Sequence, residues 1–317
     1  MADKKIIAVV GATGAQGGGL VRAILADRNG EFRVRALTRN PDSDKARALA
    51  AAGAELVRAD LDDQASLERA FAGAHGVFAL TNFWEHFSPE KELAQAGNQA
   101  RAAKAAGVHH VIWSTLEDTR RWVPLGDDRL PTLQGRYKVP HFDAKGEADA
   151  IFLRAGVPVT FLRTSFYYDN FINFPGMCPA RGSHGQLELV LPMADKRLPC
   201  IAAEDIGQCA YGILVQEREY VGRTVGIAGA HLTGTEIAAA LTRAVHRPVA
   251  YVDVNADAYR ALGFRAAAEL GNMFQFKRDF QEDFCGIRDV ALSRRLNPSL
   301  QTFDAWLARN GSRIPVR

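Results

Sequence analysis

The 317-residue chain is long enough for one large α/β domain with a smaller appendage or for two domains, and its 47% hydrophobic residues support a sizeable core. Its 39 Lys and Arg against 36 Asp and Glu leave a net charge of +3 without a dense basic run, which argues against direct nucleic-acid binding. No stretch approaches the roughly 18 apolar residues of a membrane span and no signal segment is recognisable, so we expect a cytoplasmic protein without a membrane anchor. The four cysteines form no C-x-x-C pair, so neither a disulfide framework nor a metal site is predicted.

A glycine-rich turn follows the first predicted strand. The apolar run 5–10 indicates a buried parallel strand, and a helix-like segment begins near residue 20. Glycines at positions 11, 14 and 17 allow a sharp turn, the approach of a diphosphate, and close packing of helix on strand. The anion would lie on free N–H groups at the helix N-terminus, so this stretch, Gly17 included, predicts a nucleotide site. The G-x-x-G-x-x-G spacing differs from the G-x-G-x-x-G of dehydrogenases, and the absence of a Gly-Lys-Ser/Thr ending excludes a P-loop ATPase.

The residue after the second predicted strand, 33–38, indicates which dinucleotide binds. NAD enzymes usually carry an acidic residue here for the ribose 2′-hydroxyl, whereas this chain carries Arg39. An arginine can hold a 2′-phosphate through two hydrogen bonds, and Ser43 and Lys45 stand close enough in sequence to help. An ordinary surface arginine is the alternative. Together with the glycine turn, Arg39 favours NADP(H) as the cofactor over NAD(H).

Two further predicted strands, 55–58 and 76–80, place more candidates at the same edge of the sheet. Ligands of open parallel sheets lie beyond the carboxyl ends of the strands, so residues directly after these strands face the cofactor groove. These candidates are Asp60, Leu61, Thr81, Asn82 and Phe83. The alternative interpretation of this acidic region is that it forms no adenine site and that the acid pair at 62–63 only caps the next helix.

The remaining pattern predicts a Rossmann-type α/β fold, that is, a doubly wound parallel sheet followed by a smaller lobe. Helices over 90–106 and 141–155 alternate with strands over 111–113 and 159–163, so six strands complete the sheet by about residue 165 unless later strands join it. The irregular stretch 118–140 is predicted as a loop over the site.

Residues 1–165 would form the dinucleotide-binding domain, and residues 166–317 a smaller mixed, α-rich substrate or partner lobe. Within this lobe, Thr233 followed by Glu236 has the capping-box pattern of a helix that begins there and extends to Val245. The cleft between the lobe and the sheet is the expected substrate pocket.

The catalytic motif of short-chain reductases is only partly present. These enzymes place a serine after the fifth strand and a Tyr-x-x-x-Lys on the next helix, where the tyrosine donates a proton and the lysine lowers its pKa. This chain has Ser114 and Lys145, but His141 stands in place of the tyrosine. Three interpretations remain open: His141 acts as the acid, the donor is absent and Lys145 only holds the ribose, or His141 merely begins a helix.

Along nearly its whole length the sequence resembles the NmrA-like family, atypical members of the short-chain dehydrogenase/reductase superfamily. The segments that carry the resemblance are 10–18, 38–41, 60 with 62–64, 81–85, 141–147 and 272–276. The chain looks similar to the redox-sensor subgroup, whose members bind NADP(H), lack the catalytic tyrosine and act through protein partners. Two departures are Ser43, where that subgroup often has a second basic residue, and a longer irregular loop before His141.

This resemblance implies a role for each matched position. The diphosphate is expected against Gly11, Ala12, Thr13, Gly14, Ala15 and Gln16, and the 2′-phosphate against Arg39. The adenine is expected against Asp60 and Leu61, and the ribose and nicotinamide side against Thr81, Asn82 and Phe83. Lys145 is expected on the nicotinamide ribose, and the nicotinamide end is expected under Tyr167, Tyr168, Asp169 and Asn170.

The sequence combines a complete nucleotide site with an incomplete catalytic motif. This combination favours, as the first hypothesis, an NADP(H)-binding redox sensor that acts through a regulatory protein partner. The alternative is an NADPH-dependent reductase of quinones or small carbonyl compounds, because a quinone accepts hydride with little need for a dedicated proton donor. A scaffold with a vestigial site is the third class. The partners that these hypotheses admit are a regulatory protein, a small quinone or carbonyl substrate, and a second copy of the chain in a homodimer.

Overall fold

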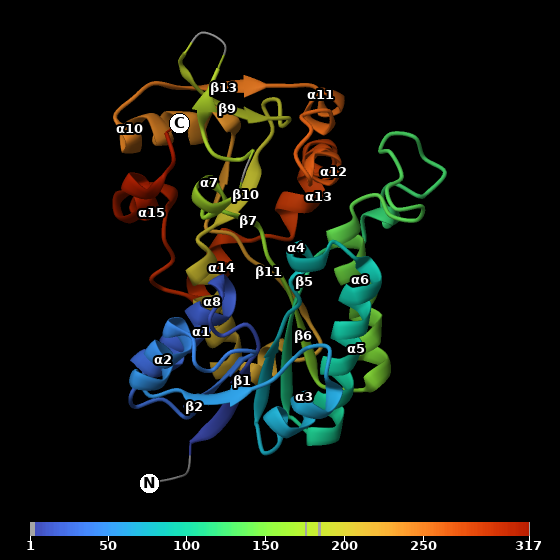
Figure 1. Cartoon of the computed structure of the whole chain (residues 1–317), viewed down its shortest axis with the longest axis vertical. Helices are drawn as coiled ribbons and strands as arrows, with labels where there is room; N and C mark the ends of the chain where they lie inside the picture. The colour runs from blue at the N-terminus through green and yellow to red at the C-terminus, as the bar shows by residue number, and fades with distance from the viewer. Residues whose placement is uncertain (1–3, 175, 183–184, 317) are drawn as a thin grey trace.

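In a computed structural model, which describes residues 4–174, 176–182 and 185–316, a parallel sheet lies below a mixed lobe (Figure 1). The sheet has seven strands in the order β11-β6-β5-β4-β1-β2-β3. Their bounds are β1 Lys5–Val9, β2 Phe32–Thr38, β3 Glu55–Arg58, β4 Gly76–Ala79, β5 His110–Thr115, β6 Val159–Arg163 and β11 Thr224–Gly226. All neighbouring strands in it run parallel, and the predicted Rossmann-type fold is confirmed.

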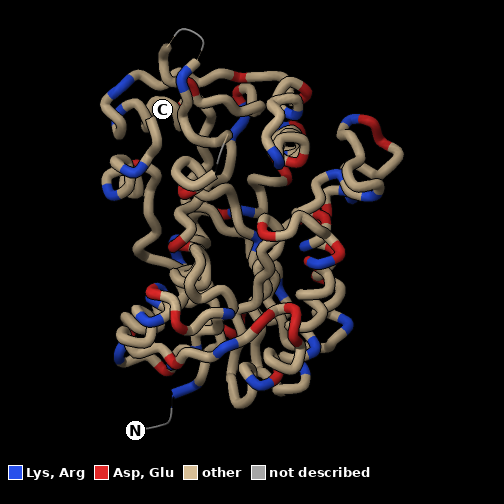
Figure 2. The backbone as a smooth tube through the Cα atoms, viewed as in Figure 1, with Lys and Arg blue, Asp and Glu red and all other residues tan. Residues whose placement is uncertain are grey.

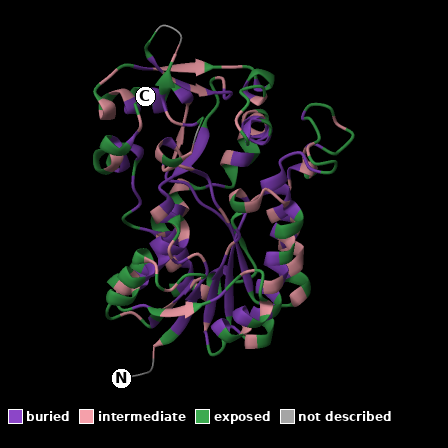
Figure 3. Cartoon of the chain, in the orientation of Figure 1, coloured by how far each residue is buried: buried purple, intermediate pink, exposed green. Residues whose placement is uncertain are grey.

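Helices cover both faces of this sheet because its strands are apolar on both sides, as their burial in Figure 3 shows. On one face lie α1 Ala15–Ala26, α2 Asp44–Ala51 and α8 Ala203–Val215; on the other lie α3 Gln64–Phe71, α5 Pro89–Ala106 and α6 Pro140–Ala155. Side chains of β1 alternate between the two cores: Ile7 and Val9 pack toward α1 and α8, whereas Ala8 and Val10 pack toward α3 and α5.

The sheet takes its seventh strand from far downstream, so six strands do not complete it and the alternative that a later strand joins it is what the structure shows. Strand β11 pairs with β6, with Thr224 opposite Phe161. Helix α8, also downstream, packs closely on α1, where a Cβ on Gly207 would lie 2.1 Å from the backbone nitrogen of Leu20. Only glycine permits this approach of two helix backbones.

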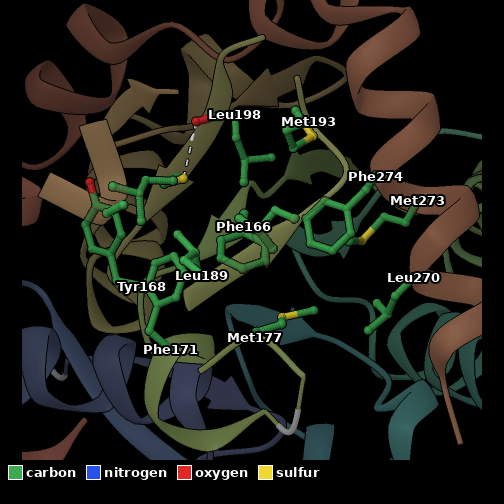
Figure 4. Close-up of a cluster of buried hydrophobic side chains, with 14 of the residues drawn as sticks. Phe166, Tyr168, Phe171, Met177, Leu189, Met193, Leu198, Leu270, Met273 and Phe274 are labelled. Carbon is green, nitrogen blue, oxygen red and sulfur yellow. Dashed lines mark hydrogen bonds between the residues drawn. The ribbon is translucent and has the colours of Figure 1, made fainter. Parts of the chain in front are cut away.

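The upper lobe contains two small sheets as well as helices. One sheet consists of β7 Phe166–Tyr167, β10 Leu198–Ile201 and β12 Ala230–Leu232, and the other of β8 Ala180–Arg181, β9 Leu187–Leu191 and β13 Val249–Asp253. Around them lie α7 Asn170–Asn173, α10 Gly234–Val245, α11 Ala256–Arg260, α12 Ala267–Asp279, α13 Gln281–Gly286 and α15 Phe303–Asn310. The predicted capping box of Thr233 and Glu236 at the start of α10 is confirmed. Phenylalanine, leucine and methionine side chains fill the lobe's core (Figure 4).

The shorter helices are α4 Phe83–His86, α9 Glu217–Tyr220 and α14 Val290–Leu296. Acidic and basic residues are interspersed along both layers, and the view in Figure 2 shows no long basic stretch. None of the helices in the described ranges is long and apolar enough to cross a membrane.

A buried ion pair connects the sheet to the lobe. Glu117 follows β5 and Arg288 follows α13, and the guanidinium donates to both carboxylate oxygens at 2.7 and 2.9 Å. The Arg288 side chain is 0% exposed and that of Glu117 is 1% exposed. Arg288 Nε also donates to the carbonyl oxygen of Thr164 at 2.8 Å. Burial alone would raise the pKa of Glu117, but the adjacent Arg288 outweighs it and holds the pKa below its usual value.

Arg288→Met is expected to destabilise the protein by about 3–5 kcal/mol, because it removes the guanidinium that is hydrogen-bonded to the buried Glu117 carboxylate and leaves Arg163, 3.9 Å away, as the counter-charge. Urea unfolding would measure the change. The double variant with Glu117→Gln should recover much of the loss, and Arg243→Met, which breaks an exposed pair with Asp304, should change stability by less than about 1 kcal/mol. A loss for Arg288→Met no larger than that of Arg243→Met would contradict the structural role of the pair.

Candidate functional site

A cavity of about 690 Å³ lies where the carboxyl ends of the strands face the lobe. On the sheet side it is lined by Val10, Gly11, residues 13–16, 37–40, Ser43, Lys45, 59–61, Leu67, 80–85, Gln95 and 114–116. On the other side it is lined by His141, Phe142, Lys145, residues 164–167, Asn170, Phe174, Met177, Leu270, Met273, Lys277 and Phe284. The sheet and the lobe therefore share one continuous cavity.

The glycine turn at one end of the cavity has the geometry of an anion cradle. Gly11 has a positive φ of 64°, and a Cβ on Gly17 would lie 2.5 Å from the Gly11 carbonyl oxygen. Gly14 begins α1 and has no side chain to occupy the first amides of the helix, and the first turn of α1, all of it described, carries no acidic residue. These features fit a diphosphate. Ala12 and Gly17 are buried and shape the turn, whereas the other residues from Gly11 to Gln16 line the cavity.

The basic residues after β2 also lie at the cavity. Arg39 lines it and is paired with Glu85 of α4, with 3.1 Å between Arg39 Nη2 and Glu85 Oε1. Ser43 lines the cavity and also caps α2, because its Oγ accepts a hydrogen bond from the Ala46 amide. Lys45 adds a second cation to the lining, so this end fits an anionic group.

The predicted adenine residues lie at the end of β3. Asp60 and Leu61 both line the cavity, and an Asp60 carboxylate oxygen accepts a hydrogen bond from the Asp62 amide at 3.0 Å. The neighbouring Asp63 caps α3 by accepting from the Ser66 amide, so the capping interpretation is correct for that residue.

Lys145 of α6 extends across the cavity to the end of β4. Its ammonium donates to the Thr81 hydroxyl at 2.7 Å and to the Thr81 carbonyl at 3.0 Å, and it lies 3.2 Å from a carboxylate oxygen of the buried Glu92. Asn82 and Phe83 follow and line the cavity. Lys145 is therefore held in a fixed position beside the predicted cofactor residue Thr81.

His141 lines the cavity in the first turn of α6 and is bound to the lobe. Its Nδ1 lies 2.6 Å from Oε1 of Glu269 in α12, and its backbone amide donates to the same oxygen at 2.7 Å. Its ring packs on Trp84 with 4.7 Å between centroids. Glu269 was not predicted from the sequence, and its pairing means that His141 does more than begin a helix.

A chain of hydrogen bonds links three segments at the floor of the cavity. The hydroxyl of Ser114, near the end of β5, donates to the side-chain carbonyl of Gln16 at 2.8 Å. The Gln16 amide donates in turn to the Tyr167 hydroxyl at 2.6 Å. The glycine turn, β5 and β7 are thus joined through side chains that the sequence predicted only as separate candidates.

Besides Ala12 and Gly17 of the glycine turn, two predicted cofactor residues of the lobe do not line the cavity. Tyr168 is fully buried and packs on the aromatic side chains of α15, and an Asp169 carboxylate oxygen accepts a hydrogen bond from the Ala203 amide at 2.9 Å. Successive side chains of an extended segment point to opposite sides, so Tyr168 faces the lobe core when Tyr167 faces the cavity. The expectation for Tyr168 and Asp169 is wrong, whereas Tyr167 and Asn170 line the cavity.

The irregular stretch 118–140 is not a lid. None of these residues, all within the described ranges, lines the cavity, and the segment projects outward beyond α6 (Figure 1). Its carbonyl groups are instead bound by α12: Asn272 donates to those of Pro131 and Lys138, and Gln275 donates to that of Arg129. The segment connects the sheet's helices to the lobe.

Sequence reasoning also missed Lys277 of α12. This side chain is 3% exposed and lines the cavity, and its ammonium lies 5.4–5.7 Å from the ring centroids of Phe142, Phe166, Phe274 and Phe284. Burial, and next the charge of Arg288, lower the pKa of Lys277 to about 7. The only available signal was a lysine directly after the apolar run that ends at Phe276.

The sheet, the glycine turn and the polar groups after β2, β4 and β5 define a protein of the dinucleotide-binding Rossmann class. The chain belongs to the NmrA-like family, whose family model matches residues 3–307. A relative named NmrA-like family domain-containing oxidoreductase FrzB, from Cladobotryum sp, is 30% identical over 236 residues, or 69% of this chain and 67% of the relative.

Two solved structures share the fold. NmrA, described as a negative transcriptional regulator and solved with NADP, is 24% identical with a TM-score of 0.78, over 96% of this chain and 94% of that one. An NADPH-dependent quinone oxidoreductase from Escherichia coli, solved with NADPH, is 23% identical with a TM-score of 0.73, over 96% of this chain and 99% of that one. NADP(H) as the predicted cofactor is consistent with both complexes.

Lys277→Met is expected to stabilise the protein near and below pH 7, on the order of 3 kcal/mol, because the native state must otherwise bury a charge. The unfolded chain binds this proton up to the ordinary lysine pKa of 10.5, whereas the folded protein releases it near pH 7. The wild type therefore gains stability relative to the variant as the pH rises between these values. Urea unfolding of both proteins across this range would measure the difference, and a difference independent of pH would contradict the buried charge.

Proposed function

We propose that this chain is an NADP(H)-dependent reductase of a planar quinone or a small aromatic carbonyl compound. The observation that supports this proposal is that one cavity extends continuously from the N-terminus of α1 to the lobe. At the lobe end it is walled by Phe142, Phe166 and Phe284, and we call this end the aromatic chamber. A protein that only senses whether a dinucleotide is oxidised or reduced needs the nucleotide-binding end of the cavity and not the aromatic chamber. Relatives named as oxidoreductases, and a quinone oxidoreductase with the same fold, support this class.

In the proposed complex, the dinucleotide lies along the sheet edge. The amides at the start of α1 hold the diphosphate, and Arg39 with Ser43 and Lys45 holds the 2′-phosphate. Asp60 and Leu61 contact the adenine, and Thr81, Asn82 and Phe83 border the ribose and nicotinamide. Lys145 donates to the nicotinamide ribose, and Tyr167 and Asn170 border the nicotinamide ring.

The reduced cofactor supplies a hydride, and the chain's own residues position the acceptor. Phe142, Phe166 and Phe284 give the chamber flat apolar walls that exclude water and suit a planar ring. His141, with Nδ1 bound to Glu269, stands at the position of the missing tyrosine. A quinone fits this arrangement because its reduction makes little demand on a dedicated proton donor.

A redox sensor that acts through a protein partner remains the second candidate, and one contact favours it. The ion pair of Arg39 with Glu85 joins the end of β2 to α4 across the proposed 2′-phosphate position. A bound phosphate would compete with Glu85 for the guanidinium, so occupancy of the site would change a contact at the surface of the protein.

Repeated oxidation of NADPH distinguishes the reductase from the redox sensor. Purified protein is expected to oxidise NADPH through many cycles with a naphthoquinone, and Lys145→Met should lower kcat/KM by at least about tenfold because a charged hydrogen-bond donor is lost. Lys196→Met, at an exposed lysine outside the cavity, is the control. Tight NADPH binding without repeated turnover on quinones or aromatic carbonyls would contradict the reductase and favour the sensor.

Arg39→Ala is expected to weaken NADPH binding by about 1.5–3 kcal/mol through the loss of a charge-assisted contact, and to leave NADH binding nearly unchanged. Calorimetric titration with both nucleotides measures the difference. Arg47→Ala, which removes an exposed arginine of α2 outside the cavity lining, is the matched control. Equal losses for NADPH and NADH would rule out the 2′-phosphate role of Arg39.

A further inference from the structure

The aromatic chamber contains one buried cation whose position the dinucleotide does not explain. Lys277 projects from α12 in the lobe, and its ammonium is surrounded by phenylalanine rings from α6, β7, α12 and α13. Most of the predicted cofactor residues lie on the sheet side of the same cavity, whereas Lys277 lines it from the lobe. Lys277 therefore belongs to the part of the cavity where an acceptor substrate would lie.

Other buried lysines of this chain are paired, and the comparison is informative. Lys138 is also almost fully buried, and its ammonium donates to the carbonyl groups of Asp127 and Leu130 and to the Thr132 hydroxyl. Lys145 has Thr81 and Glu92 as partners. Within the described ranges, by contrast, no hydrogen bond or ion pair of the Lys277 ammonium is found, and four phenylalanine rings surround it with centroids 5.4–5.7 Å away.

A buried ammonium without an acceptor costs stability, because the rings replace only part of its hydration. A methionine or leucine would fill the same space without that cost. Because the ammonium lies on the wall of a cavity, a bound ligand can supply the acceptor oxygen for its missing hydrogen bond. The surrounding ring faces set the shape of that ligand, since offset stacking on phenylalanine favours a flat aromatic molecule.

We propose that Lys277 is the substrate-recognition residue of this site, donating a hydrogen bond to an anionic or carbonyl oxygen on a planar aromatic quinone that stacks among the phenylalanine rings. This inference rests on the proposed reductase function and names the residue that selects the substrate. It assigns preference to quinones whose ring carries an acidic hydroxyl, because an ionised oxygen pairs with the ammonium more strongly than a neutral carbonyl does.

Several charged or titratable groups face Lys277, and they set how its charge responds to pH. Arg288 opposes the ammonium charge, whereas Glu117, itself paired with Arg288, favours it. The Cys200 thiol also faces Lys277, but burial raises its pKa and keeps it neutral. The His141–Glu269 pair lines the same cavity from α6 and α12. Because the pKa of Lys277 is lowered to about 7, the ammonium is lost in mildly alkaline solution, and binding of an anionic quinone weakens there.

The test compares two probes on protein saturated with NADP+, which cannot deliver hydride, so that binding is measured without turnover. The probes are 1,4-naphthoquinone, which is neutral, and its 2-hydroxy derivative, which is ionised at neutral pH. Isothermal titration at about pH 6 should show the ionised probe binding Lys277→Met at least about tenfold more weakly than wild type, with a much smaller change for the neutral probe. Lys196→Met, at an exposed lysine of the same lobe, should bind both probes as the wild type does.

Raising the solution to about pH 9 should weaken binding of the ionised probe to the wild type and not to Lys277→Met, since only the wild type loses a charge at this position. Equal affinities of the two proteins for the ionised probe, or no binding of either probe by wild type, would overturn the assignment. Failure to bind NADP+ would instead remove the proposed function. In that case the same titrations on cofactor-free protein still test Lys277, and thermal unfolding of the variant verifies that it is folded.

Discussion

The ion pair of Glu117 with Arg288 is the contact on which the shape of the cavity depends. It joins the end of a central strand to the point where the chain leaves α13, and it is inaccessible to water. Phe284 of α13 packs on the Arg288 guanidinium at 3.6 Å and also forms part of the aromatic chamber. The same arginine repels the Lys277 ammonium and adds to the larger effect of burial in lowering its pKa. One structural pair thus fixes where the lobe meets the sheet and sets the electrostatics of the chamber between them.

Much of the fold was predictable because buried parallel strands leave a clear apolar pattern, as in Lys5–Val9 and Val159–Arg163. The seventh strand was not, since Thr224–Gly226 is too short to show any periodicity. Its place is determined by tertiary contacts: a Cβ on Gly226 would lie 2.0 Å from the Ile287 carbonyl oxygen, so glycine alone permits that packing. The strands of the two small sheets in the lobe are two to five residues long, and the lobe was predicted only as a mixed, α-rich region with a strand near Val249.

The residues of the candidate site also fall into those that the sequence could predict and those that it could not. Residues just after strands of the main sheet, such as Arg39 and Thr81, were predictable because parallel strands all end at one edge. Side chains from the lobe were not, because a single sequence does not reveal which face of an irregular segment meets the sheet. Tyr167 and Tyr168 are adjacent and equally aromatic, yet only Tyr167 lines the cavity. Glu269 and Lys277 lie on one helix whose burial on several sides hides any polar stripe.

The attachment of the 118–140 segment to α12 has a consequence for how this protein can vary. Asn272 and Gln275 bind backbone carbonyl groups of the segment, and every residue type, proline included, provides such a group. The anchor therefore places little restriction on the side chains of Arg129 and Pro131, whereas Lys138 is fixed by its own buried hydrogen bonds. The outward-projecting part between these residues can change its sequence while α12 stays in place. The exposed part of the segment is thus a surface whose contacts can change without rebuilding the cavity behind it.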